Sequence, residues 1–382
     1  MHVALKVAAL PLLGAALPTG PHQVRFAPEP GATLVISIEQ SSRTNMVYES
    51  WCPLNNGVRD EEEAYNVDGS SSVEYEIAII LEDTYGPIRK DVGPQAKAPD
   101  ARSGLGSRFP YESITRSFKA IDGEATTAEF TKGDEKPETT TVELSSPLSG
   151  RAVQFAWNQR SGSFVPTFGA PRDKKASEGV LLSSLHVDGS GDWFLPPWNG
   201  GPADGPRGDQ NLQPTDRWDV PPAAWYAMLD IGGYFWIGPE ASEPPSRATL
   251  EAVQSINAQL VKNAAGRIVC QFEELREVDG RQLAVLSIDA NVTSKATSDR
   301  TDEHGGTREK VTETVEQTIH GKGECLWDIA GKRCHSIEIR SESTDRTSFV
   351  SIQRKNARET SGAEILSVEE TVSDFVMGFE VR

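Results

Sequence analysis

Tryptophan is concentrated in one segment of the chain, and indole rings are the side chains here best suited to hold a ligand. Residues 193–245 contain five of the eight Trp and ten of the 24 Pro. An aromatic platform of this kind binds a sugar or another apolar ligand. The same rings can instead fill a core that seals the junction between two β regions. The candidate contact residues are Trp193, Trp198, Trp218, Trp225 and Trp236, and both interpretations stay open at this point.

The acidic residues and histidines form no pattern that predicts a catalytic or metal site. The run 60–63 is typical of a solvated loop, because acid–base catalysis needs two carboxylates held in a cleft and no partner is evident. Asp188 and Asp192 resemble part of a calcium loop, but Trp193 stands where Gly is required and Asn199 where Glu is required. We expect a tight turn there. The six His form no zinc motif, and no nucleophile or phosphate-binding motif occurs. We therefore assign no catalytic residue, metal or cofactor.

Two cysteines flank a predicted hairpin. A four-residue loop over 328–331 places Cys325 opposite Cys334, close enough for a disulfide. A three-residue loop over 329–331 instead pairs Cys325 with His335 and puts the two thiols on opposite faces. Turn chemistry and the apolar pattern favour the second register. Cys52 and Cys270 are expected to be small buried hydrophobic residues.

Charge and length exclude several classes of protein. The chain has 382 residues and a formal net charge of −18, a sign that repels nucleic acids and anionic lipid surfaces. No apolar stretch reaches the roughly 20 residues of a transmembrane span. Residues 1–23 resemble a signal peptide, with Lys6 before an 11-residue apolar run over 7–17. We expect export to the periplasm or the extracellular space, and the alternative is a cytoplasmic protein whose first buried element lies there.

Strand signals dominate the rest of the chain. The clearest hairpin spans 267–293, where Asp279-Gly280 forms a two-residue loop. The expected pairs are Val278–Arg281, Leu275–Ala284, Glu273–Leu286, Gln271–Ile288 and Val269–Ala290. The apolar stripe of the second strand predicts a half-buried antiparallel sheet, and it consists of Ala284, Leu286, Ile288, Ala290 and Val292. Further strands are expected at 32–40, 73–82, 112–121, 124–131, 139–145, 309–327, 334–342, 347–354 and 363–381.

Few helices are expected. Ser246 is predicted to cap a helix that runs to about Ala264. Its apolar side is expected to contain Leu250, Val253, Asn257, Leu260 and Val261. A shorter helix is predicted after Ser177, with Leu181, Leu182 and Leu185 on its apolar side. Residues 52–72 and 86–110 are rich in turn-forming and charged residues, and both are expected to be solvated loops.

Several turn-and-strand patterns cover the second half of the chain. They are Asp216-Arg-Trp218, Gly266-Arg-Ile-Val, Asp279-Gly-Arg-Gln-Leu-Ala-Val and Gly323-Glu-Cys-Leu-Trp-Asp-Ile-Ala-Gly331. They resemble uncharacterised exported β-rich proteins of bacterial envelopes, whose layout is similar to that of lipoprotein-carrier-like half-barrels. The resemblance implies a mainly β (α+β) fold: one or more large curved antiparallel sheets, or a half-barrel meander, with one or two helices on the concave side. It supplies no catalytic residues and implies a binding or structural role.

These observations predict four regions: a signal peptide at 1–23, a β region at 24–192, a Trp/Pro-rich junction at 193–246, and a helix with a β meander at 247–382. Whether the two β regions share one sheet stays open.

The predicted function is that of an exported, non-enzymatic binding or structural protein of the envelope. Its expected partner is a lipid, another apolar or amphipathic molecule, or an envelope protein. The alternative is an envelope glycan hydrolase that uses a carboxylate pair.

Overall fold

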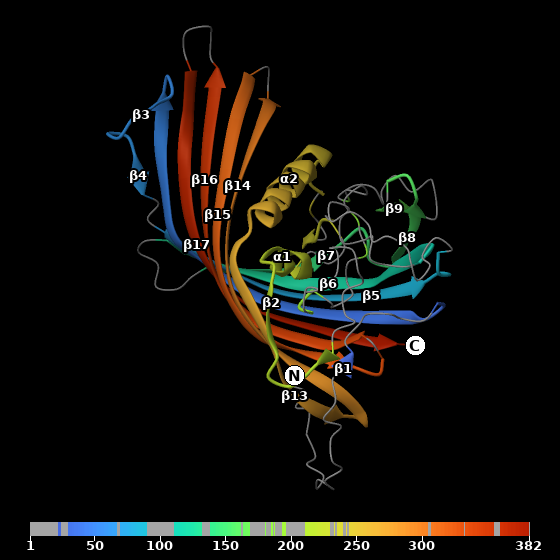
Figure 1. Ribbon diagram of the computed structural model, residues 1–382. Coiled ribbons are helices and arrows are strands. Elements are labelled where there is room, and N and C mark those ends of the chain that lie inside the picture. The colour runs from blue at the N-terminus through green and yellow to red at the C-terminus, as the bar shows by residue number, and fades with distance from the viewer. Residues whose placement is uncertain are drawn as a thin grey trace.

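The chain forms one curved antiparallel sheet of 15 strands, which bends around the helices in the computed structural model (Figure 1). The main path of the sheet is β11-β13-β14-β15-β16-β17-β2-β5-β6-β7-β12. Strands β3 and β4 pair with β2, β8 pairs with β6, and β9 pairs with β8. The two β regions therefore share one sheet, and β17 joins them by pairing with β2. The expected mainly β fold with helices on the concave side is confirmed.

The structure describes residues 22–23, 30–66, 69–89, 111–131, 138–161, 163–168, 180, 185, 187, 193–195, 211–229, 233, 235–239, 242, 244–304, 307–331, 333–354 and 360–381. The predicted signal peptide at 1–23 lies almost wholly outside these residues and stays a prediction. Most of the predicted loop at 86–110 and of the predicted helix after Ser177 lies outside them as well, and the turn expected at Asp188–Asp192 lies wholly outside them.

The strands of the large sheet differ widely in length. Its elements, with the two helices among the described residues, are β2 (Thr33–Asn55), β3 (Val58–Arg59), β4 (Tyr65–Asn66), β5 (Gly69–Tyr85), β6 (Ser113–Thr131), β7 (Glu138–Ser145), β8 (Arg151–Asn158), β9 (Ser163–Phe168), β11 (Arg217–Val220), α1 (Ala223–Leu229), β12 (Gly238–Pro239), α2 (Arg247–Asn263), β13 (Ala265–Val278), β14 (Arg281–His304), β15 (Thr307–Asp328), β16 (Arg333–Arg354) and β17 (Thr360–Val381). The short strands β1 (His22–Gln23) and β10 (Asn211–Leu212) form a separate pair.

The core lies on one half of the concave face, which we call the lower half and which contains the buried residues named below. Its residues alternate along the strands with charged residues on the outer face, because successive side chains of a strand point to opposite faces. Leu34, Ile36 and Ile38 of β2 are buried in this way, as are Ile337 and Ile339 of β16. The stripe predicted on β14, from Ala284 to Val292, is also buried. The described part of the 193–229 region packs against the same core.

The upper half of the sheet is more open. Strands β14 to β17 contain 22 to 24 residues each, so they extend well beyond the core. The two strands expected at 334–342 and 347–354 are one continuous strand, β16. The strands expected at 112–121 and 124–131 also merge, into β6. The residues between the predicted strands are mostly charged or carry hydroxyl groups, and they continue the backbone hydrogen bonding of the sheet. This is possible because both faces of this part of the sheet accept polar residues.

The hairpin of β13 and β14 confirms the predicted turn and corrects part of the register. Val278 pairs with Arg281 and Leu275 pairs with Ala284, as expected. A bulge between Phe272 and Glu274 then shifts the register by one residue, so that Phe272 pairs with Leu286. The predicted pairs Glu273–Leu286, Gln271–Ile288 and Val269–Ala290 are therefore wrong. The bulge has a clear physical benefit, because it turns the apolar residues Ile268, Cys270 and Phe272 into the core, where all three are buried.

The hairpin of β15 and β16 differs from both predicted registers. Asp328 pairs with Arg333, Trp327 pairs with Cys334, and Cys325 pairs with Ile337. The register shift between Leu326 and Trp327 leaves His335 as the extra residue. This shift returns Cys334 to the concave face, so the expectation that the two thiols lie on opposite faces is wrong. The Asp328 carboxylate stabilises the turn by accepting a hydrogen bond of 2.7 Å from the Gly331 amide.

Two further expectations are corrected, on residues 52–72 and on the buried side of α2. Residues 52–72 are not one loop, because β2 continues to Asn55, β3 and β4 follow, and β5 begins at Gly69. Helix α1 was not anticipated in the Pro-rich segment. The cap of α2 is confirmed, since the Ser246 side chain accepts a hydrogen bond from the Thr249 amide. The buried side of α2 is only partly as predicted: Leu250, Ile256 and Leu260 are buried, whereas Val253 and Val261 are exposed.

Candidate functional site

The concave face contains a cavity of about 410 Å³, which we call the concave cavity. It lies between the sheet on one side and the helices α1 and α2 with residues 233–237 on the other. Figure 1 shows both helices inside the bend of the sheet. The long strands of the sheet form one wall of the cavity, which we call its floor, and the two helices form the opposite wall, which we call its roof. Each strand of the floor pairs with another strand on both sides, so backbone hydrogen bonds hold the floor in place.

Most of the lining of the concave cavity is apolar. The apolar side chains come from four strands, two helices and the segment 235–237, and several also belong to the main core. Those on the sheet are Ile77 and Ile79 of β5, Ile319 of β15, Ile339 of β16 and Phe375 of β17; those above it are Trp225, Met228, Leu229, Phe235, Ile237, Leu260 and Val261. Such a lining favours an apolar ligand group, because burial removes its surface from water.

The rest of the lining is polar and uncharged. Ser341 and Ser343 of β16 and Ser373 of β17 contribute hydroxyl groups, and Gln40, Asn257 and Gln317 contribute amides. The Tyr226 hydroxyl donates a hydrogen bond of 3.1 Å to Gln317 Oε1. Burial raises the pKa of Tyr226 to about 12, so its phenol remains a neutral donor at physiological pH. The polar part of the lining therefore offers donors and acceptors that carry no charge.

A half-buried carboxylate, that of Asp345, lies beside Gln317 of the cavity lining. Asp345 pairs with Gln317 across the sheet, so the two side chains share the concave face. Its Oδ1 is buried and has no hydrogen-bond partner among the described residues. Burial raises the pKa of Asp345, a hydrogen bond with Gln317 opposes the rise, and the Glu369 carboxylate adds to it. Glu369 is the direct cross-strand neighbour of Asp345 on β17.

Close packing of α1 on the sheet fixes the roof. The Trp225 ring lies directly over Gly321 of β15: a Cβ built on this glycine would come 2.1 Å from Trp225 Cη2. The absence of a side chain at residue 321 is thus what allows the indole to approach the strand. Trp225 is 1 % exposed and serves both the core and the concave cavity. Sequence reasoning named Trp225 but did not identify its partner.

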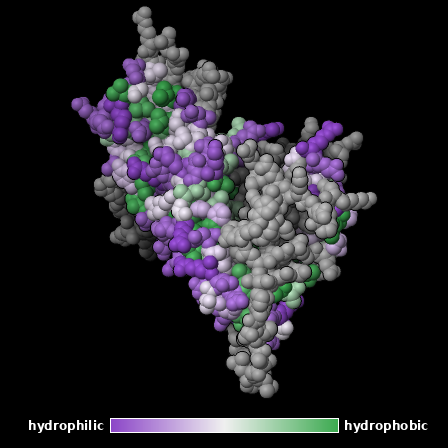
Figure 2. Space-filling model, in the orientation of Figure 1, coloured by the Kyte–Doolittle hydropathy of each residue, from purple (hydrophilic) through white to green (hydrophobic). Residues whose placement is uncertain are grey.

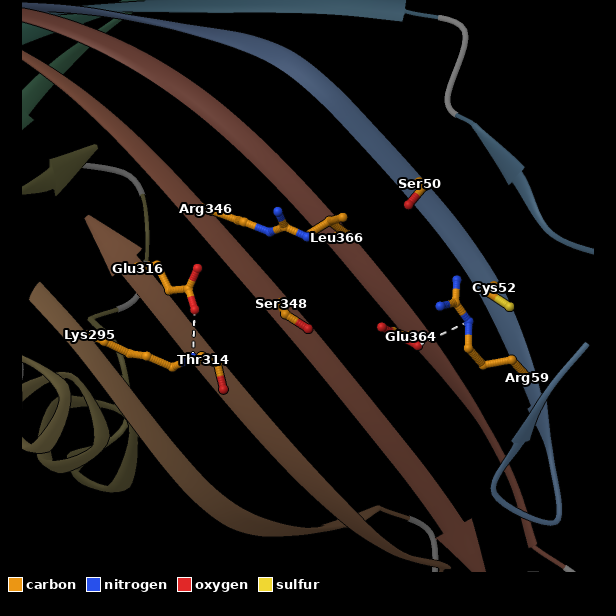
Figure 3. Close-up of a pocket in the computed structure, with 10 residues that line it drawn as sticks. All are labelled: Ser50, Cys52, Arg59, Lys295, Thr314, Glu316, Arg346, Ser348, Glu364 and Leu366. Atoms are coloured by element: carbon orange, nitrogen blue, oxygen red, sulfur yellow. Dashed lines mark hydrogen bonds and ion pairs between the residues drawn. The ribbon is translucent and has the colours of Figure 1, made fainter. Parts of the chain in front are cut away.

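A second hollow, of about 540 Å³, lies on the outer face (Figure 3). Arg346 follows Asp345 along β16 and therefore points away from the concave cavity. The Lys295 ammonium bonds to the Glu316 carboxylate at 2.5 Å, and Arg59 lies 3.4 Å from Glu364. The Lys295 charge keeps the pKa of Glu316 below its usual range.

The geometry of this hollow does not favour carboxylate catalysis. Glu316 and Glu364 belong to strands two apart in the sheet and lie in rows four residues apart. At about 4.8 Å per strand and 3.3 Å per residue, their Cα atoms are separated by about 16 Å. Paired catalytic carboxylates lie about 5–9.5 Å apart. Each of the two also has a basic neighbour, which favours the charged form and opposes a role as a general acid.

The five candidate Trp residues do not form one platform. Trp193, Trp218 and Trp225 are buried in the core, and Trp218 Nε1 donates a hydrogen bond of 2.9 Å to the Phe194 carbonyl. Trp236 is half-buried, and Trp198 lies outside the described residues. Only Trp225 of the five lines the concave cavity as far as the structure describes it. Most of its lining residues, including the three serines, carry no recognisable motif and were missed.

The described surface mixes polar and apolar groups. Figure 2 shows hydrophilic and hydrophobic residues side by side over the upper part of the sheet. Exposed apolar residues there include Val47, Tyr65 and Ile365. Within the described residues, no cluster of His, Cys, Asp or Glu is arranged to hold a metal ion. No described helix is long and apolar enough to cross a membrane.

Comparison with known proteins assigns no family. No family model matches the sequence, and a search of curated proteins finds no match. Among solved structures, an outer membrane channel from Pseudomonas putida F1 is 8 % identical, with 91 % of this chain and 97 % of that chain covered and a TM-score of 0.15. OccK7 (OpdD) from Pseudomonas aeruginosa is 7 % identical, with 91 % and 99 % covered and a TM-score of 0.16. Scores this low support no conclusion on fold or function.

Proposed function

We propose that this protein binds one amphipathic small molecule in the concave cavity. The observation that supports the proposal best is that one cavity is lined both by apolar side chains and by uncharged polar side chains. The apolar part of the ligand would lie against Ile339 and Phe375, and its polar group would reach Ser341, Ser343 and Gln317. A volume of about 410 Å³ falls within the range of about 300–1,000 Å³ that is usual for small-molecule sites.

The proposal also includes the place where the protein acts. The signal-like segment at 1–23 supports export, and the resemblance of the second half to envelope proteins supports a role in the periplasm or outside the cell. A carrier or a ligand-dependent interaction module of the envelope needs no catalytic group. We therefore propose the concave cavity, in place of a platform of five Trp residues, as the binding site. Trp225 is the residue that belongs both to the five candidates and to the lining of the cavity.

A hydrolase with two carboxylates is the alternative, and one pair has suitable spacing. Asp345 and Glu369 face each other on adjacent strands, where paired Cα atoms lie about 4.5–5.5 Å apart. Neither residue lines either of the two cavities described here. Their side chains leave the same face in parallel, so they do not flank a space in which a glycosidic bond would lie. Binding is therefore the better supported function.

The proposal can be tested with N-phenyl-1-naphthylamine, a neutral apolar dye whose fluorescence increases on burial. We expect saturable binding of about one dye per protein chain. The variant Ser341→Phe fills the floor of the cavity and should weaken binding at least tenfold. The matched control is Glu342→Phe, on the same strand but the opposite face, where the residue is exposed. It should change affinity less than twofold.

Two results would contradict the proposal. One is the absence of saturable dye binding by the unmodified protein. The other is an equal loss of binding in Ser341→Phe and Glu342→Phe, because a site on the concave face should be insensitive to the outer residue. Circular dichroism of both variants shows whether the fold is intact. If Ser341→Phe does not fold, Ser341→Leu provides the same test with a smaller side chain.

A further inference from the structure

Two buried thiols face each other at the base of the β15–β16 hairpin. The sulfur atoms of Cys325 and Cys334 are 3.7 Å apart, and the two residues are 1 % and 0 % exposed. The bulge at His335 brings them to the same face. A disulfide requires an S–S distance of about 2.05 Å, so the sulfurs must approach each other by about 1.7 Å. Cys334 lies opposite Trp327 and so is diagonal to Cys325, a position in which residues lie about 7–8 Å apart. Closing the bond therefore needs a small backbone shift as well as side-chain rotation.

We propose that Cys325 and Cys334 are a disulfide-forming pair that is joined when the protein folds under oxidising conditions. Among the described residues, neither of the other two cysteines has its sulfur in contact with a second cysteine, although Cys270 is close enough to Cys325 for their charges to interact. Cys52 lies on β2, where its thiol donates to the Pro53 and Asp60 carbonyls. Cys270 lies on β13, and burial raises the pKa of its thiol. The pairing is therefore specific to the hairpin, and it does not depend on the proposed ligand.

The oxidation proceeds by thiol–disulfide exchange with a protein disulfide or a small-molecule disulfide. The thiolate of one cysteine attacks the oxidant, forms a mixed disulfide and releases one thiolate of the oxidant. The second cysteine thiolate attacks the cysteine sulfur of the mixed disulfide and releases the second oxidant thiolate. The two protons lost by Cys325 and Cys334 are taken up by these thiolates. The protein thus loses two electrons and two protons, and the oxidant gains them.

Burial determines when the reaction can occur. An oxidant cannot reach thiols that are fully enclosed by the core, so exchange takes place while the hairpin is still accessible. The bond closes a ten-residue loop over 325–334. Loop-entropy arguments give a shift of roughly 100-fold in the folding equilibrium for a loop of this size. It also fixes the strands beside Trp327, whose indole is fully buried.

The test uses the full chain and needs no variant. The reduced protein is unfolded, refolded in a buffer of oxidised and reduced glutathione, denatured with iodoacetamide in the absence of reductant, and analysed by mass spectrometry. We expect alkylation of Cys52 and Cys270 only, and a cross-linked peptide that contains Cys325 and Cys334. Four alkylated cysteines, or any other cross-link, would overturn the proposal.

A stability measurement supports the assignment independently. The oxidised protein should unfold at a higher urea concentration than the protein treated with reductant. Cys325→Ser should abolish this difference, whereas the matched variant Cys52→Ser should retain it. An unchanged difference in Cys325→Ser would show that another bond is responsible and would also reject the proposed pair.

Discussion

Substitution of Gly321 by alanine should destabilise the protein, although alanine normally favours a strand over glycine. The glycine lies in the interior of β15, where its replacement by alanine gains about 0.5–1 kcal/mol of backbone entropy. The new methyl carbon, however, would lie 2.1 Å from Trp225 Cη2 and 2.6 Å from Cζ3. Ordinary carbon–carbon contacts are about 3.5–4.0 Å. The indole must therefore move by well over 1 Å.

The core leaves little room for that movement. Trp225 is almost fully buried, and α1 is held by its contacts with the sheet. Overpacking of this kind costs about 1–3 kcal/mol, and the entropy gain offsets only part of it. We expect a net loss of about 1–2 kcal/mol, which lowers the melting temperature by roughly 1 °C per kcal/mol in a chain of 382 residues. Because Trp225 lines the concave cavity, dye affinity should also fall.

The assay is urea denaturation followed by Trp fluorescence and far-UV circular dichroism. The compensating variant Gly321→Ala/Trp225→Phe removes the outer ring of the indole, so it should be more stable than the sum of the two single substitutions by about 1 kcal/mol or more. If Gly321→Ala is as stable as the unmodified protein, or if the two substitutions are additive, the proposed contact does not determine the position of α1.

Three further predictions concern other parts of the fold. Arg116 donates to both carboxylate oxygens of Asp83, at 2.7 and 2.6 Å, within the core, so Arg116→Met should cost about 3–5 kcal/mol because it leaves a buried charge uncompensated. Adding Asp83→Leu should recover at least 2 kcal/mol in a double-mutant cycle measured by urea denaturation. The raised pKa of Asp345 means that the folded protein binds more protons than the unfolded chain just above the ordinary Asp pKa. Stability should therefore fall as pH rises from about 4 through the raised pKa, and Asp345→Asn should flatten this part of a pH series of unfolding curves. Ser246→Ala removes the N-cap acceptor of α2 and should cost about 1 kcal/mol; a thermal melt that shows no change would mean that α2 is held by its packing alone.

Local signals predicted the elements in which turn chemistry and apolar pattern agree. Asp279-Gly280 determines a two-residue turn, and Asp279 adopts the positive φ of 51° that such turns need. Ser246 marks the start of α2, because a side-chain acceptor there replaces a missing backbone bond. The buried stripe on β14 follows from strict alternation. These features depend on residues close together in sequence, and the sequence alone was sufficient for them.

The remaining features depend on packing between distant segments. The bulge at Phe272 and Glu274 is favoured because it buries apolar side chains against other strands, which no local pattern records. The position of α1 depends on Gly321, almost 100 residues later in the chain. The concave cavity requires the strand order β15-β16-β17-β2-β5, and that order is a property of the whole sheet. Its serines therefore look like ordinary residues of a wetted strand.

The pairing of β17 with β2 has a consequence for how the molecule reaches its native state. Thr371 and Thr44 are 327 residues apart in sequence and share a side-chain hydrogen bond of 2.9 Å. Contacts of such separation form late and slow folding, since the entropy of closing the intervening loop must be lost first. Until β17 is in place, β16 and β2 are both open edges that can pair with other chains. A newly made chain is therefore most prone to aggregate in the interval before its last strand docks, and a factor that shields these two edges would assist it most.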